Sequence, residues 1–167
     1  MLASLQTTSL YFLDWNLERI ARCVEALPED RLWTRPNGNS LSVGNQILHL
    51  AGNIRQWLVS GLGGQPDVRR RDEEFSTPGG LSAEQLMDLL TDVVEDAKLV
   101  VSDLTVENLA RERPVQAFHH DGLFILIHAI EHFSYHTGQV IFYTKAELDV
   151  DLNFYGDVDL TRKGVEG

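Results

Sequence analysis

Three histidines, His128, His132 and His136, recur at intervals of four residues in the last third of the chain. An α-helix turns by about 100° per residue, so side chains four residues apart lie on the same face. Two imidazoles one turn apart can bind a single transition-metal ion and leave positions for a ligand from another helix and for water. The spacing therefore predicts a metal site on a helix.

Other polar side chains fall on the same face of this helix. On a helical wheel, Asp121, Tyr135, Gln139 and Tyr143 join the three histidines in a stripe about 100° wide. The remaining positions are nearly all apolar, which is typical of a helix buried in a bundle. Buried polar groups need partners, and a metal ion or a water-filled pocket would supply them. The alternative is core histidines hydrogen-bonded to their neighbours, but three in one stripe favour a metal or catalytic site.

A further ligand must come from another helix, and the chain before residue 119 contains only one histidine, His49. The polar residues that would share its helical face are Ser42, Asn45, Asn53, Gln56 and Ser60. Such a stripe either faces solvent or lines a pocket, and periodicity alone does not decide between the two. His119 and His120 directly precede the last helix and are expected at a loop or helix end.

Four segments have the apolar periodicity of helices, and none has the alternation of a strand. Two helix N-termini are indicated by local residues. Ser40 and Ser42 are good N-cap residues for the second helix, and Ser82–Gln85 has the pattern of a capping box for the third. A short additional helical turn is expected within 102–113. The four predicted helices are Thr8–Ala26, Ser40 or Ser42 to Ser60, Ser82–Val101 and Asp121–Glu147. The chain is therefore predicted to be an all-α, up-down-type four-helix bundle that forms a single domain over residues 1–167.

The connection between the second and third predicted helices, Gly61–Gly80, is unusually long for a compact domain. Connections of this length are usually functional or mobile, so it is expected to be either a lid or a disordered surface loop. The tail Asp149–Gly167 is polar and carries no clear pattern.

The charge and cysteine content of the chain argue against several classes of partner and compartment. The chain has 14 basic and 25 acidic residues, which gives a net charge of −11 and argues against nucleic acid or anionic membranes as partners. The basic run Arg69–Arg71 is followed at once by the acidic run Asp72–Glu74. No stretch is long and apolar enough to span a membrane. The single cysteine, Cys23, excludes an internal disulfide and is expected to be a packing residue, so the cytoplasm is the expected compartment.

The segment Glu131–Val140 resembles the last-helix motif of the DinB-like superfamily of metal-dependent enzymes. Trp33–Pro36 and Ser42–Leu50 are similar to segments at the second helix of that family, and Arg71–Phe75 and Leu152–Tyr155 to segments of an uncharacterised subgroup. The resemblance implies a four-helix bundle, commonly dimeric, whose metal is held by one histidine of the second helix and two of the last.

Carried over position by position, the resemblance implies that His49, His132 and His136 are the metal ligands. It places His128 one turn away, next to the ligands or facing the substrate, and makes Gln139 an orienting partner. Many relatives have Glu after the first ligand of the last helix and Arg after the second, where this chain has Phe133 and Thr137. The resemblance therefore implies the fold and the metal site more strongly than the thiol-transferase activity of one branch.

The resulting hypothesis is a metal-dependent enzyme of hydrolase or thiol S-transferase type that acts on a small molecule. Zn²⁺ is the expected metal, with Ni²⁺ or Fe²⁺ as alternatives, and an open coordination position would activate water or a thiolate. Asp121, His128, Tyr135 or Gln139 would assist proton transfer or position the substrate. The competing hypothesis is a non-catalytic metal-binding or structural stress-response homodimer.

Overall fold

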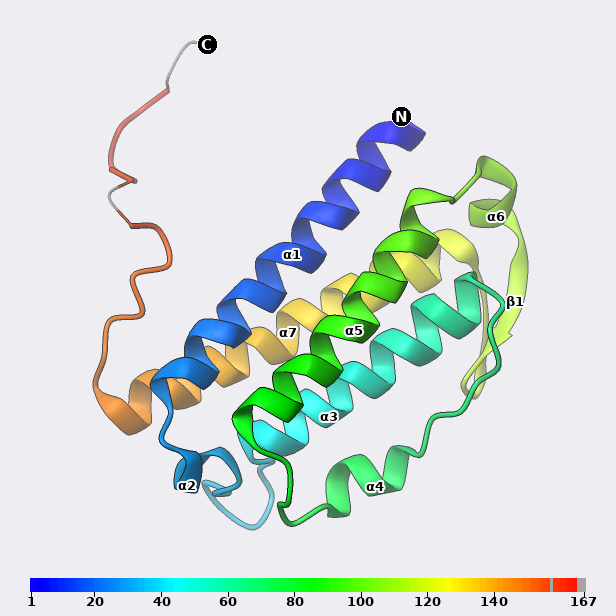
Figure 1. Cartoon of the computed structure of the whole chain (residues 1–167). Helices are drawn as coiled ribbons and strands as arrows, with labels where there is room; N and C mark the ends of the chain where they lie inside the picture. The colour runs from blue at the N-terminus through cyan, green and yellow to red at the C-terminus, as the bar shows by residue number, and fades with distance from the viewer. Residues whose placement is uncertain (157, 165–167) are drawn as a thin grey trace.

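The computed structural model describes residues 1–156 and 158–164 and contains four long helices that lie side by side (Figure 1). The first, α1 (Leu2–Ala26), packs against α5 (Ala83–Ser102) and α7 (Gly122–Leu148). The remaining long helix is α3 (Val43–Ile54), which continues into a π-helix, η1 (Arg55–Leu62), and packs against α5 and α7 from the other side. The prediction of an all-α four-helix bundle is confirmed, whereas its up-down order is not, because the consecutive long helices α3 and α5 run in the same direction.

The direction of the helices explains the long connection after η1. In Figure 1, α1 and α7 run one way along the bundle, and α3 and α5 run the other way. The chain must therefore return along α3 before α5 can begin. Residues 63–81, called the strap below, make this return and contain a short helix, α4 (Arg71–Ser76), packed on α3. The strap thus packs on α3 through α4.

The N-termini of three helices lie where the capping residues in the sequence predict them. The side chain of Ser42 accepts a hydrogen bond from the Asn45 backbone N–H, and Ser82 and Gln85 form the expected capping box. Asp121 caps α7 by accepting a hydrogen bond from the backbone N–H of Phe124. The first helix begins at Leu2 rather than Thr8, because residues 2–8 contain no glycine or proline to interrupt it.

Several short elements were not predicted. The π-helix η1 replaces the last turns of the second predicted helix, and a two-stranded antiparallel hairpin, β1 (Glu112–Val115) and β2 (Phe118–Asp121), precedes α7. Helix α2 (Glu29–Leu32) follows α1, whereas α6 (Val106–Ala110) confirms the additional turn expected within 102–113. The hairpin has only four residues in each strand, too few for a clear alternating pattern.

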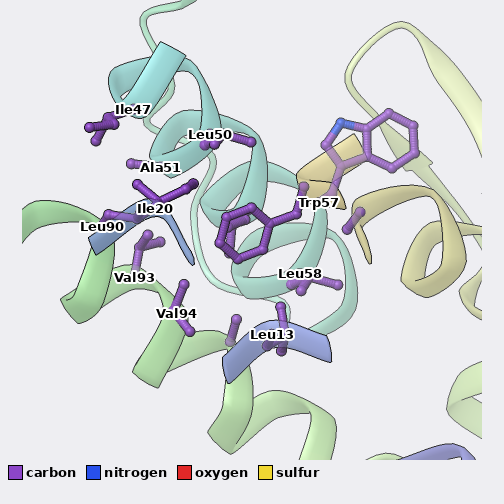
Figure 2. Packing of buried hydrophobic residues seen from close by; sticks show 14 of the residues in the cluster. Leu13, Ile20, Ile47, Leu50, Ala51, Trp57, Leu58, Leu90, Val93 and Val94 are labelled. Atoms are coloured by element: carbon purple, nitrogen blue, oxygen red, sulfur yellow. The ribbon is translucent and has the colours of Figure 1, made fainter. Parts of the chain in front are cut away.

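The hydrophobic core lies between α1, α3, η1, α5 and α7, and Figure 2 shows part of it. Leu13 and Ile20 of α1 are completely buried, as are Leu50 of α3 and Leu90 of α5. Burying one such side chain stabilises the fold by about 1.5–3 kcal/mol. The apolar face of α3 points into this core, and its opposite, polar face packs against the strap and α7. Among the described residues, no helix combines the length and the apolarity needed to cross a membrane.

Candidate metal centre

Three histidines from two antiparallel helices converge between α3 and α7. His49 comes from α3, and His132 and His136 come from successive turns of α7. One ring nitrogen from each can be chosen so that all three lie within 4.8 Å of one another. The Nε2 atoms of His49 and His132 are 3.1 Å apart, close to the separation of about 3.3 Å that two imidazoles have on a tetrahedral zinc ion. The cluster therefore fits a metal ion of this size.

The hydrogen bonds of two rings fix which nitrogen faces the centre of the cluster. The Nδ1–H of His49 donates to Oε2 of Glu74 at 2.9 Å, and the Nδ1–H of His136 donates to Oε1 of Gln46 at 3.4 Å. In both rings the lone pair of Nε2 is therefore available to a metal ion at the centre of the cluster. A partner on the outer nitrogen is the usual way in which proteins orient a histidine that binds a metal.

The electrostatics of the cluster favour neutral imidazoles. Burial, together with repulsion by the neighbouring histidines, lowers the pKa of His132 from 6.5 to about 3. Burial and the proximity of His49 lower the pKa of His136 to about 4. A ring must be neutral to bind a metal through its lone pair, so these two histidines are in the required form at neutral pH.

The strap contributes a carboxylate and a guanidinium that sequence analysis did not identify as site residues. Arg69 donates from Nε to Oε1 of Glu74 at 2.7 Å and from Nη2 to Oε2 at 2.8 Å, so the pair is bidentate. Only 2% of the Arg69 side chain and 8% of the Glu74 side chain are exposed. Burial by itself would raise the pKa of Glu74, but hydrogen bonds from Arg69 and His49 outweigh it and hold the pKa below its ordinary value. An ionised carboxylate therefore supports His49.

The network continues from Arg69 and ties the strap to the bundle. Arg69 also donates from Nη1 to Oε1 of Gln56 at 2.8 Å, and Gln56 donates back to Asp67 of the strap at 2.7 Å. The ring of Phe75 packs on His49 with 5.0 Å between ring centroids. In the sequence, the only sign of this pair is the basic run Arg69–Arg71 followed by the acidic run Asp72–Glu74, and adjacency alone does not indicate which of these charges are buried. Arg70 and Glu73 form such an exposed pair, whereas Arg69 and Glu74 form a buried one.

The polar stripe on α3 and η1 lines the site rather than facing solvent. Asn45, Asn53 and Gln56 are each less than 9% exposed. This resolves the alternative that helical periodicity left open, because the stripe faces the strap and α7. Gln46, which was not assigned to the stripe, also contributes to the site through His136.

Three further predicted site residues lie beside the cluster. The ring of His128 packs on Trp57 at a tilt of 39°, with 3.8 Å between centroids, and lies 5.8 Å from the ring of His132. Tyr135 packs its edge against His136 at 5.1 Å, and the proximity of Gln139 partly offsets the lowering of the pKa of the same histidine. Tyr135, Gln139 and Gln46 line a cavity of about 920 Å³ between the loop after α2 and the C-terminal half of α7, and this cavity adjoins the cluster without being lined by any of its three histidines. This volume is that of a pocket for a small molecule.

The structure does not bring Asp121 to the cluster. It caps the N-terminus of α7, eleven residues before His132, which corresponds to about 16 Å along the helix. The helical wheel placed it in the histidine stripe because angle alone ignores distance along the axis. His119 and His120 lie on β2 and are outside the cluster, in agreement with their expected place before the last helix.

Comparison with solved structures identifies similar folds. A DinB-like protein from Bacillus subtilis has 19% identity over 89% of this chain and 97% of that chain, with a TM-score of 0.67. A conserved protein from Enterococcus faecalis has 17% identity over 86% and 97%, with a TM-score of 0.73. A DinB-like protein from Bacillus cereus has 17% identity over 86% and 93%, with a TM-score of 0.67. No curated protein matches the chain.

At these identities the structures support the fold alone. The family model of the DinB superfamily matches residues 13–140, a region that includes all three clustered histidines and the strap. With this match over most of the sequence, the chain belongs to the DinB superfamily.

Proposed function

We propose that this protein is a metal-dependent enzyme that acts on a small molecule at His49, His132 and His136. The observation that carries the proposal is the convergence of three imidazoles from α3 and α7, their ring nitrogens within 4.8 Å of one another. Zn²⁺ suits an all-imidazole site best, and Ni²⁺ or Fe²⁺ are alternatives.

The number of ligands supports a catalytic rather than a structural metal. Structural zinc sites use four protein ligands, whereas catalytic sites use three and keep a position open. In the part of the chain that the structure describes, no fourth His, Cys, Asp or Glu joins the three histidines. A bound divalent metal would supply Lewis acidity that activates water or a thiol, which suits a hydrolase or a thiol S-transferase.

The residues around the cluster have separate roles in this proposal. Glu74 and Gln46 hold the outer nitrogens of His49 and His136, which orients both rings. Tyr135 and Gln139 line the cavity beside His136 and would position the substrate there. His128 lies one turn from His132 against Trp57 and would contact the substrate from the opposite side of the cluster. Asp121 has no part in the proposed site.

Measurement of bound metal tests the proposal. The purified wild type, prepared without chelator, should contain one metal ion per chain, and His132→Ala should lose it. His128→Ala should keep the metal because its ring is outside the cluster. His119→Ala, at an exposed position on β2, is the matched control. A wild type without stoichiometric metal would contradict the proposal, and equal losses in His128→Ala and His132→Ala would reassign the ligands.

One observation favours the structural alternative and requires its own test. His49 is bonded to Glu74, so a metal at the cluster would also strengthen the attachment of the strap. If the metal is catalytic, the metal-free protein should keep its helical circular dichroism and unfold cooperatively, and bound Co²⁺ should respond spectroscopically to added azide. Loss of the fold on metal removal, with no response to azide, would favour a structural metal.

A further inference from the structure

The three histidines differ in what their outer nitrogens contact. Glu74 accepts from Nδ1 of His49, and Gln46 accepts from Nδ1 of His136. Nδ1 of His132 is buried and has no hydrogen-bond partner among the described residues. Since Nε2 of His132 faces His49 at 3.1 Å, the proton of the neutral ring must lie on Nδ1 when Nε2 binds a metal. A buried donor of this kind needs an acceptor.

One buried acceptor on the facing helix also has no partner. Oδ1 of Asn53 is shielded from solvent and forms no hydrogen bond with any described residue, and the whole residue is only 4% exposed. Asn53 follows His49 by four residues on α3, so it lies on the face that carries His49. A buried amide oxygen without a donor is as unfavourable as a buried N–H without an acceptor.

The antiparallel packing of α3 and η1 on α7 places these two groups at the same level. Gln46 contacts His136 at one end of the polar face, and Trp57 packs on His128 at the other. Asn53 lies between Gln46 and Trp57, just as His132 lies between His136 and His128. The unpaired acceptor is therefore opposite the turn of α7 that carries the unpaired donor.

We propose that Asn53 is the positioning residue of His132, and that its Oδ1 accepts the Nδ1–H of that ring, directly or through one water, when the cluster binds a metal. Each of the three histidines then has its own acceptor: Glu74 for His49, Gln46 for His136 and Asn53 for His132. This inference rests on the proposed metal site and adds the residue that sets the tautomer and orientation of its central ligand.

The test measures Zn²⁺ affinity by competition with a chromophoric chelator. Asn53→Leu keeps the volume and removes the acceptor, so the affinity should fall by about 10–100-fold, as it does when other acceptors of this kind are removed. Gln46→Leu should show a loss of similar size. Asn53→Asp keeps an acceptor and should stay within a few-fold of the wild type. Asn16→Leu replaces another buried helical asparagine, on α1 and outside the cluster, and should bind Zn²⁺ like the wild type.

A second measurement does not depend on how the leucine variant folds. In zinc-bound wild type, the Nδ1–H of His132 should give a slowly exchanging proton resonance, and Asn53→Asp should shift it. Lack of this resonance, or wild-type affinity in Asn53→Leu, would overturn the role of Asn53 while leaving the metal site intact. A wild type that does not bind Zn²⁺ would instead contradict the proposed function itself.

Discussion

At the scale of single residues, the site depends on a buried carboxylate that is remote from the ligands in sequence. Glu74 bonds to His49 and to Arg69, and its pKa is held below the ordinary value, so it remains ionised at neutral pH. A carboxylate on the outer nitrogen makes an imidazole a stronger metal ligand. The same carboxylate would overlap a side-chain carbon added at Gly52, so this glycine makes room for the support of His49.

Replacing Glu74 should therefore weaken metal binding without removing a ligand. We expect Glu74→Gln to lower Zn²⁺ affinity by about 10–100-fold, as measured by chelator competition, because a neutral amide supports His49 less well. Glu73→Gln is the control, since the side chain of Glu73 is 66% exposed and, among the described residues, forms an ion pair with exposed Arg70 alone. Equal affinities in the two variants would show that Glu74 does not support the metal.

Cys23 is expected to behave as a packing residue. It is completely buried, and burial raises its pKa from 9.0 to about 11. A thiol reagent at pH 8 should label the native protein only as fast as it unfolds, and should label it at once in denaturant. Because the unfolded state releases this proton at lower pH, stability should also fall by up to about 1.4 kcal/mol per pH unit between pH 9 and 11. Rapid labelling of native protein at pH 8 would show that Cys23 is accessible.

At the scale of elements, the sequence predicts helix boundaries that depend on neighbouring residues. It does not predict contacts between residues that are far apart in the chain. Ser42, Ser82 and Asp121 predict helix starts because a cap bonds within one turn. The strap is different. Its place is determined by contacts of Glu74 and Arg69 with residues of α3 and η1, and no local pattern encodes them. The ligand set was implied by resemblance to a family, whereas helical periodicity alone left His49 undecided.

The strap should be coupled to metal occupancy through His49 and Glu74. Arg70 and Arg71 are exposed on it and offer sites for trypsin. Metal binding should hold His49, and through it Glu74, so the strap should open more often when the metal is removed. We expect chelated protein to be cut between residues 69 and 72 several times faster than metal-bound protein, as followed by mass spectrometry.

Glu74→Gln controls for the coupling, because in this variant the rate of cleavage should depend much less on metal. Cleavage at the same rate with and without metal in the wild type would show that the strap and the cluster are independent.

At the scale of the whole molecule, exposed apolar side chains gather where α1 and α7 lie side by side. Phe12 is 41% exposed, Ile127 50% and Tyr135 60%, and all three line a cavity of about 470 Å³ between the two helices. Exposed apolar surface of this kind commonly marks a contact with another protein. Tyr135 also lines the larger cavity beside His136, so this face adjoins the candidate site.

We therefore predict that the protein is a homodimer and that this face, defined by Phe12, Ile127 and Tyr135, forms the interface. Phe12→Glu places a charge in the apolar contact and should give a monomer in analytical ultracentrifugation, whereas Leu99→Glu, at a position 69% exposed on α5, should remain dimeric. Because the clustered histidines lie between α3 and α7, the monomeric variant should keep its metal. Its substrate affinity should nevertheless change, because Tyr135 would lose the partner that covers it. A wild type that sediments as a monomer at micromolar concentration would contradict this arrangement.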